Sequence, residues 1–253
     1  MKIALFGAAG WVGRAVLQNL RDHKHHVRAI DYSEAAWESL RDIDGTWQGD
    51  ETLYGDIADF AAVDRALDGV DAVIHTAVLS GGSGGYGVNS DTPFLVNLKG
   101  LWNVLDAARE RGIGRIVHVG SCQVEHPAGT FFDADVRRPD GSLYAVSKRL
   151  QEEMCRQFHD AFGMSIVVLR PCSIVDSRLG ISKYRKPLAG GWNTGWVCRH
   201  DLAEACRLAA QVEGLGMEVL HTAGPQEASA FCNVARTRAV LGMEFGGDLD
   251  QYR

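Results

Sequence analysis

The sequence predicts an α/β protein built on a doubly wound parallel sheet, with a small cap in its C-terminal part. Short apolar runs alternate with stretches of helical periodicity as far as residue 170, and a glycine-rich turn follows the first run. The 253 residues are 46% hydrophobic and 23% charged, which is an ordinary globular composition. Strands that alternate with helices of this length run parallel, because each helix carries the chain back across the sheet.

The individual elements follow from local patterns. Residues 3–6 form an apolar run that ends at Gly7, and apolar residues at helical spacing follow it. The expected strands cover residues 3–6, a run ending at Asp31, a weak candidate at 52–54, and then 72–75, 115–119, 165–169 and 219–221. The expected helices cover residues 11–20, 61–67, 94–111, 144–162, 200–211 and 231–241.

The chain divides near residue 170 into two unequal parts. We assign residues 1–170 to a dinucleotide-binding domain, because six strands and their helices fall there. The remaining residues, 171–253, are too few for an independent core. We expect them to form a small cap on the same core, over the carboxyl edge of the sheet where open α/β folds bind ligands.

The bulk properties exclude several classes of partner. The formal net charge is -6, so the protein offers no basic face to a nucleic acid or an anionic membrane. No apolar stretch is long enough to span a bilayer. The six cysteines are scattered without a spacing suited to zinc, so we expect no metal and a cytoplasmic enzyme.

The turn after the first strand has the pattern of a phosphate-binding loop. Its sequence is Gly7-Ala8-Ala9-Gly10-Trp11-Val12-Gly13. Glycine permits the tight turn and lets backbone N–H groups and the following helix N-terminus meet a pyrophosphate. Asp31 ends the second strand, where an acidic side chain reaches the adenosine ribose and repels a 2′-phosphate. We therefore predict a Rossmann-type fold that binds NAD through Gly7, Ala9, Gly10, Trp11, Val12, Gly13 and Asp31.

Tyr144 and Lys148 carry the strongest chemical signal. They lie four residues apart on one helix face, so the lysine ammonium can lie close to the phenol. A phenol with a pKa of about 10 is too weak a base at neutral pH, and a nearby cation favours its ionised form. Ser121 ends the fifth strand and points into the same crevice, where its hydroxyl can hold a substrate oxygen. We predict Tyr144 as the general acid/base.

In this order the motifs resemble the extended, NAD-dependent epimerase/dehydratase branch of the short-chain dehydrogenase/reductase superfamily. The resemblance implies that Asp56 and Ile57 flank the adenine, that Ala77 contacts the central part of the cofactor, and that Asn97 supports a proton relay through Lys148. It also implies that Pro171 and Ser173 lie beside the nicotinamide. Together with Tyr144 and Lys148, these residues complete the expected cofactor site.

Departures from the branch narrow the expected substrate. The sugar dehydratases place an Asp-Glu pair after the catalytic hydroxyl residue, whereas this chain has Cys122-Gln123. Fewer than 90 residues follow Leu169, which leaves little room for a nucleotide carrier. The short tail and the basic loop at Lys183, Arg185 and Lys186 look most like the uronate dehydrogenases. We expect Ser121, Gln123, Tyr144, Ser173 and Arg185 to contact the substrate.

These observations predict a dehydrogenase that transfers a hydride between NAD and a hydroxyl-bearing carbon of a small free sugar or sugar acid. Two alternatives remain open, namely an epimerase that retains NAD through each cycle and a non-catalytic redox sensor that binds NAD. The resemblance also implies a homodimer built from the helices at 94–111 and 144–162.

Overall fold

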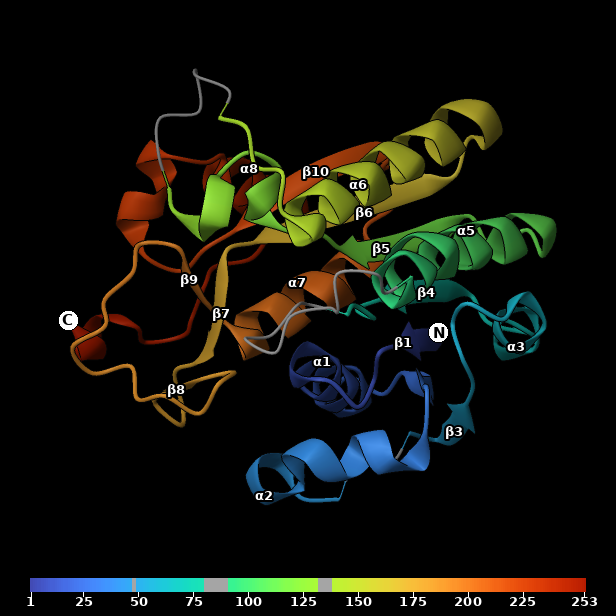
Figure 1. The fold of residues 1–253 in the computed structure, drawn as a ribbon, viewed down its shortest axis with the longest axis horizontal. Helices are drawn as coiled ribbons and strands as arrows, with labels where there is room; N and C mark the ends of the chain where they lie inside the picture. Colours follow the sequence, from blue (N-terminus) through green and yellow to red (C-terminus); the bar gives the residue numbers. More distant parts are fainter. Residues whose placement is uncertain (47–48, 80–90, 132–137) are drawn as a thin grey trace.

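Seven parallel strands form the central sheet, in the order β10-β6-β5-β4-β1-β2-β3 (Figure 1). The structure is a computed structural model that describes residues 1–46, 49–79, 91–131 and 138–253. The strands of this sheet are β1 (Lys2–Phe6), β2 (His26–Asp31), β3 (Glu51–Tyr54), β4 (Ala72–His75), β5 (Arg115–Val119), β6 (Ser165–Pro171) and β10 (Met217–Thr222). The predicted α/β fold with a Rossmann-type sheet is therefore confirmed.

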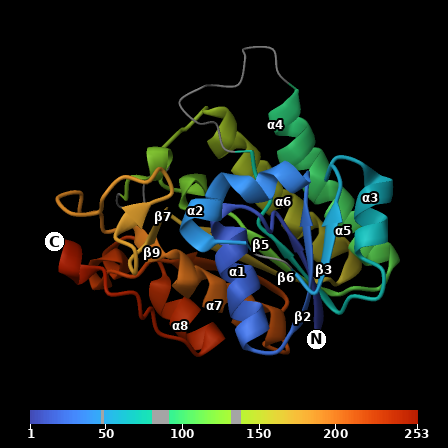
Figure 2. The ribbon, with the colours of Figure 1, turned by 90° about the horizontal axis from the view of Figure 1, so that it is seen from below.

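Helices cover both faces of the sheet (Figure 2). They are α1 (Trp11–Asp22), α2 (Arg41–Asp44), α3 (Phe60–Ala66), α4 (Thr92–Phe94), α5 (Gly100–Glu110), α6 (Leu143–Phe162), α7 (Arg199–Gln211) and α8 (Val234–Leu241). Successive side chains of a strand point to opposite faces. Ile3 and Leu5 accordingly pack in the cluster that contains α1 and α7, whereas Ala4 and Phe6 pack in the cluster that contains α3, α5 and α6.

Shorter helical segments connect these elements. The 3-10 turns are η1 (Glu34–Leu40), η3 (Cys122–Val124), η4 (Pro127–Gly129), η5 (Gln226–Ala230) and η6 (Asp250–Tyr252), and η2 (Leu95–Lys99) is a π-helix. The helix expected over residues 94–111 therefore begins as α4 and widens into η2 before α5 follows. The last helix begins at Val234 instead of residue 231, because the side chain of Asn233 caps it by accepting from Arg236 N at 3.1 Å.

The part of the chain after residue 170 contributes to both the central sheet and a second, smaller one. β10 pairs with β6 at one edge of the central sheet, and α7 packs in the same cluster as α1. β7 (Ser173–Asp176), β8 (Ile181–Ser182) and β9 (Trp196–Cys198) form the small sheet, which sequence periodicity did not reveal because these strands are only two to four residues long. The division at residue 170 stays a prediction.

The strand order reverses between β1 and β4, which are neighbours in the sheet. The connections after these two strands leave in opposite directions, so a crevice opens at their carboxyl ends. This crevice is where the sequence placed the cofactor and the catalytic group.

Candidate active site

The glycine-rich loop between β1 and α1 fits a bound pyrophosphate. A Cβ atom on Gly7 would lie 2.6 Å from Ala77 N, and one on Gly13 would lie 2.0 Å from Gly7 O, so neither position tolerates a side chain. Gly7 also has φ +80°, a conformation that glycine adopts without strain. Gly10 is exposed, and α1 begins after it without a side-chain cap. The first-turn N–H groups, which include those of Trp11 and Val12, are therefore available to an anion.

Asp31 joins this loop directly. Its Oδ2 accepts from Ala9 N at 2.8 Å and its Oδ1 accepts from Tyr32 N at 2.8 Å. Burial raises the pKa of the carboxyl, and the two backbone N–H groups act in the opposite direction. A carboxylate oxygen can accept more than one hydrogen bond, so the group retains capacity for ribose hydroxyls.

Two buried arginines that the sequence analysis missed brace the loop from behind. Arg14 is 1% exposed, and its Nε donates to Ala9 O at 2.9 Å while its other nitrogens donate to Trp37 O and Gly45 O. Arg199 lies 4.2 Å from the ring centroid of Trp11. Arg14 lies on a helix that the sequence predicts. Its burial could not be predicted, because helical periodicity alone does not distinguish a buried arginine from a solvated one.

Arg199 also ties the cap to the cofactor side of the molecule. It donates to Asp176 Oδ2 at 2.6 Å and to both oxygens of Asp44, at 2.8 and 2.6 Å. These contacts join β7, α7 and α2, which are far apart in the sequence. The bidentate pair fixes the position of α2 relative to the small sheet.

Lys148 links the catalytic helix to the end of β5. Its ammonium donates to Val119 O at 3.0 Å, two residues before Ser121, and lies 5.9 Å from the ring centroid of Tyr144. Tyr144, Lys148 and Ser121 are thereby brought to one crevice. Burial lowers the pKa of Lys148 to about 7. The amine can therefore gain or lose its proton near neutral pH.

Ser121 and Asn97 are both buried at this crevice, at 4% and 1% exposure. Ser121 Oγ accepts from Gln123 N at 3.1 Å, which orients the hydroxyl and holds Gln123 beside it. Asn97 lies in η2, a π-helical segment of the kind often found at functional sites. Its Nδ2 lies 3.4 Å from Ser147 Oγ, next to Lys148, and its Oδ1 accepts from Leu79 N at 2.8 Å.

The other sequence-predicted cofactor residues line the same edge of the sheet. Asp56 and Ile57 line a cavity between β2, β3 and α3, together with Ile30 and Leu53. Ala77 lies against Gly7, as the close approach of its backbone N shows. Pro171 is the last residue of β6, and Ser173 is the first residue of β7.

Arg185 lies in the exposed loop after β8, and its guanidinium is engaged in this structure. Its Nη1 and Nη2 donate to the two oxygens of Asp42 at 2.7 and 2.8 Å. The Arg185 side chain is 51% exposed and the Asp42 side chain 57%. A substrate carboxylate would therefore have to replace Asp42 at this arginine.

Two buried histidines beneath Lys148 were also missed by the sequence analysis. His75 and His118 end or nearly end β4 and β5, and their Nδ1 atoms lie 3.0 Å apart. Burial lowers the pKa of His75 to about 3, and the charge of Lys148 adds to this effect. Both rings are therefore neutral at physiological pH, and one Nδ1–H donates to the other ring.

The glycine-rich loop with Asp31 and the group of Ser121, Tyr144 and Lys148 both lie at the carboxyl edge of the sheet, where the strand order reverses. The fold and the site therefore define an NAD-dependent enzyme of the short-chain dehydrogenase/reductase type, which acts on a CH–OH group. The NAD dependent epimerase/dehydratase family matches residues 3–182, and the chain belongs to this family.

The relatives extend this assignment. The chain is 27% identical over 230 residues to the uronate dehydrogenase of Pseudomonas syringae pv. tomato, which covers 87% of this chain and 73% of that relative. The crystal structure of uronate dehydrogenase from Agrobacterium tumefaciens matches with a TM-score of 0.77 at 24% identity, over 100% of this chain and 86% of that one. A UDP-glucuronic acid 4-epimerase from Bacillus cereus, solved in complex with UDP-glucuronic acid and NAD, matches with a TM-score of 0.77 at 17% identity, over 100% and 96%. At these identities the two structures confirm the fold, and the family assignment confirms NAD.

A search of the described residues found no helix that combines the length and apolar character needed to cross a bilayer.

Proposed function

We propose that the protein is an NAD-dependent dehydrogenase that oxidises a free hexuronic acid, or a similar small carboxylated sugar, at its anomeric hydroxyl to a lactone. The observation that carries this proposal is the similarity to a uronate dehydrogenase over 87% of the chain. The Cys122-Gln123 pair after Ser121 also supports it, because this position offers no carboxylate to drive water elimination.

The chain's own residues divide the proton chemistry between them. Ser121 holds the anomeric oxygen, and Tyr144 takes the hydroxyl proton as the carbonyl forms. Lys148 favours the ionised phenol and passes the proton onward. Bound NAD would supply the acceptor for the hydride that leaves the anomeric carbon. The products are thus the lactone, NADH and one proton.

Arg185 is the residue that we assign to the substrate carboxylate. An arginine fork binds a carboxylate bidentately, as it already binds Asp42. Since an exposed ion pair of this kind contributes only about 0–1 kcal/mol, exchanging one carboxylate for another at this arginine costs little. In this assignment the substrate acid group would displace Asp42 from the guanidinium.

The reaction class is tested by following NADH formation at 340 nm with free uronates, the matching neutral aldoses and UDP-linked uronates. We expect net NADH with free uronates, and with NAD+ in preference to NADP+ because Asp31 repels a 2′-phosphate. Interconversion of epimers without net NADH would instead establish the NAD-retaining epimerase. Tight NAD binding without turnover of any substrate would favour the redox sensor.

Replacing Arg185 by alanine tests the carboxylate assignment. We expect KM for a uronate to rise about tenfold or more, with a much smaller change for the neutral aldose, because the variant removes binding that only the acid makes. Asp42→Asn should lower KM for the uronate by freeing the guanidinium. Lys186→Ala, the next residue in the same exposed loop, is the matched control and should change neither. Equal effects of Arg185→Ala on acid and aldose would refute the assignment.

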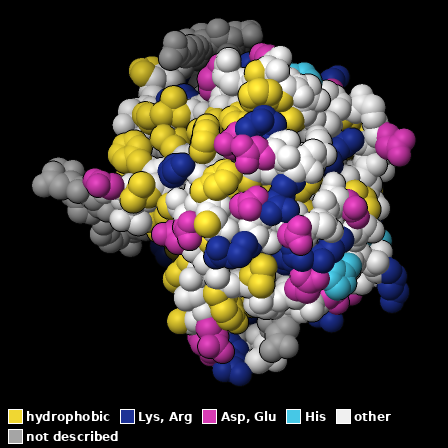
Figure 3. Space-filling view, turned by 90° about the vertical axis from the view of Figure 1, so that its right-hand side faces the viewer, with side chains coloured by type: hydrophobic (Ala, Val, Ile, Leu, Met, Phe, Trp, Pro, Cys, Tyr) yellow, Lys and Arg dark blue, Asp and Glu magenta, His cyan; other side chains and the backbone are white. Residues whose placement is uncertain are grey.

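We also propose that the protein forms a homodimer through α4, α5 and α6. Several large apolar side chains on these elements are exposed, among them Phe94 at 46%, Trp102 at 39% and Leu150 at 46%. Figure 3 views the side on which α5 and α6 end, and hydrophobic side chains gather there beside a mixed charged surface. We expect light scattering to give twice the 27.5 kDa chain mass, and Leu150→Glu to give the monomer mass. A monomeric wild type would contradict this.

All six cysteines are free, which supports a reducing compartment and therefore the cytoplasm. We keep the division into residues 1–170 and 171–253 as part of the proposal, with the second part covering the carboxyl edge of the sheet.

A further inference from the structure

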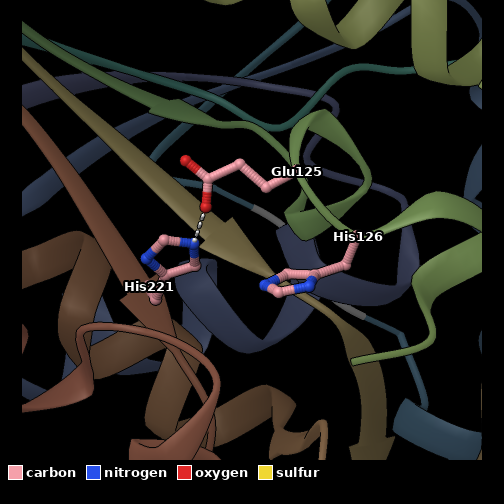
Figure 4. A group of neighbouring side chains, drawn as sticks. All are labelled: Glu125, His126 and His221. Atoms are coloured by element: carbon pink, nitrogen blue, oxygen red, sulfur yellow. Dashed lines mark ion pairs between the residues drawn. The ribbon is translucent and has the colours of Figure 1, made fainter. Parts of the chain in front are cut away.

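Glu125, His126 and His221 converge where β6 and β10 end, beside the crevice that holds Ser121 (Figure 4). One ligand atom from each residue lies within 4.8 Å of the other two. His126 is 0% exposed and His221 is 7% exposed, whereas the Glu125 side chain is 42% exposed. The two imidazoles of the cluster are thus buried, and the Glu125 carboxylate is the part of the cluster that solvent reaches.

The side chains of His221 and Glu125 meet directly. His221 Nε2 lies 3.2 Å from Glu125 Oε2, and the two side chains point at each other in Figure 4. Both atoms can ligate a metal, because a neutral imidazole nitrogen and a carboxylate oxygen each have a lone pair to donate. A cation held between them would take the place of the ring proton on Nε2.

The neighbouring charges permit a cation at this point. Arg170 Nη1 lies 2.5 Å from Glu125 Oε1, and its Nη2 lies 2.7 Å from Glu152 Oε1. The negative charge of the two carboxylates therefore exceeds the positive charge of the one guanidinium. Arg170 uses only one oxygen of Glu125 and leaves Oε2 directed at His221. In known metal sites, a group that hydrogen-bonds to a ligating carboxylate without binding the metal orients that carboxylate, as Arg170 does here.

We propose that Glu125, His126 and His221 form a binding site for a divalent transition metal ion of the zinc class, with a fourth position left for water. Zinc takes imidazole and carboxylate ligands at about 2.0–2.2 Å, which puts tetrahedral ligand atoms roughly 3.3–3.5 Å apart. The 3.2 Å contact already has nearly this length. Since the three ligand atoms lie within 4.8 Å of one another, His126 has to approach by at most about 1.5 Å. Imidazole ligands favour zinc over magnesium or calcium.

The metal would be structural and would serve no step of the proposed reaction. It would tie the segment of η3 and η4, which directly follows Ser121, to the end of β10. The sequence analysis expected no metal, because the cysteines have no spacing suited to zinc. Residues 125 and 126 lie almost a hundred residues from His221, so no local pattern indicates this cluster. This inference is independent of the substrate proposal.

The test is calorimetric titration of the full-length protein with Zn²⁺ after the protein has been stripped with a chelator. We expect one Zn²⁺ per chain, no competition from excess Mg²⁺, and a rise in Tm when Zn²⁺ is added. Glu125→Gln and His221→Ala should each weaken binding by at least about tenfold and abolish the Tm rise. His23→Ala, which removes an exposed histidine at the end of α1, is the control and should bind as the wild type does.

Three outcomes would overturn the proposal. The first is a stripped wild type that binds no stoichiometric Zn²⁺. The second is unchanged binding by both Glu125→Gln and His221→Ala. The third is loss of binding in Cys172→Ser with retention in His221→Ala, which would place the metal on the half-buried Cys172 thiol that directly follows β6. If Glu125→Gln fails to fold because Arg170 loses a partner, His221→Ala, which leaves that ion pair intact, decides the result.

Discussion

Replacing Tyr144 by phenylalanine is expected to abolish turnover, with a loss of roughly 10² to 10⁴ in kcat, while NAD binding persists. The substitution removes only the hydroxyl that takes the substrate proton, and the glycine-rich loop and Asp31 lie on other elements. Lys148 retains its hydrogen bond to Val119 O, so the helix keeps its place against β5. Steady-state rates, together with NAD titration by protein fluorescence, measure the two effects separately.

Tyr184→Phe is the matched control for this experiment. Tyr184 is 62% exposed in the loop after β8, and losing its hydroxyl should leave kcat unchanged. A Tyr144→Phe enzyme that keeps substantial activity would show that another group transfers the proton. Loss of NAD binding in the same variant would show that Tyr144 holds the cofactor more than it serves the chemistry.

Replacing Glu152 by alanine is expected to lower the free energy of unfolding by about 3–5 kcal/mol. Glu152 accepts from Arg170 Nε at 2.8 Å and from Nη2 at 2.7 Å, and both side chains are only 7% exposed. Removing one partner leaves Arg170 in the interior with Glu125 alone. The cost arises because the buried guanidinium loses its two hydrogen bonds to Glu152 and keeps only the half-exposed Glu125 as an anionic partner. Denaturant unfolding followed by circular dichroism measures it.

Glu153→Ala provides a control on the same helix, one residue away. Its side chain is 57% exposed and pairs with Arg156 at 3.6 Å, so the substitution should change stability by less than about 1 kcal/mol. If the two variants unfold at the same denaturant concentration, the buried pair has no special role. A Glu152→Gln variant should fall between them, because the amide keeps one hydrogen bond to Arg170.

Much of the fold follows from local pattern alone. The strand at 3–6, the glycine-rich turn and the helix after it are all visible in the sequence, because a buried parallel strand is a short apolar run and a covering helix has apolar residues at its own period. The strands at 173–176, 181–182 and 196–198 were not predicted, since two to four residues are too few to establish a period. The late start of α8 depends on capping by Asn233, which competes with helix propensity.

Part of the site could be predicted from the sequence for a related reason. Tyr144 and Lys148 share a helix face because of helical spacing, and Ser121 and Asp31 end strands whose carboxyl ends meet at one edge. These placements require only the parallel topology. The ion-pair partners of Arg185 and Arg199 could not be predicted from the sequence, because Asp42 and Asp44 lie more than 140 residues away along the chain.

The sequence by itself determined the α/β fold class, the glycine-rich turn and the spacing of Tyr144 and Lys148, all of which rest on patterns between residues close along the chain. Only the tertiary structure decided which charged side chains are buried and what they meet. It paired Arg170 with Glu152 and Glu125, placed His75 against His118, and brought His221 to Glu125. The reason is that burial and charge pairing depend on how distant segments pack, and that packing leaves no periodic mark in the sequence.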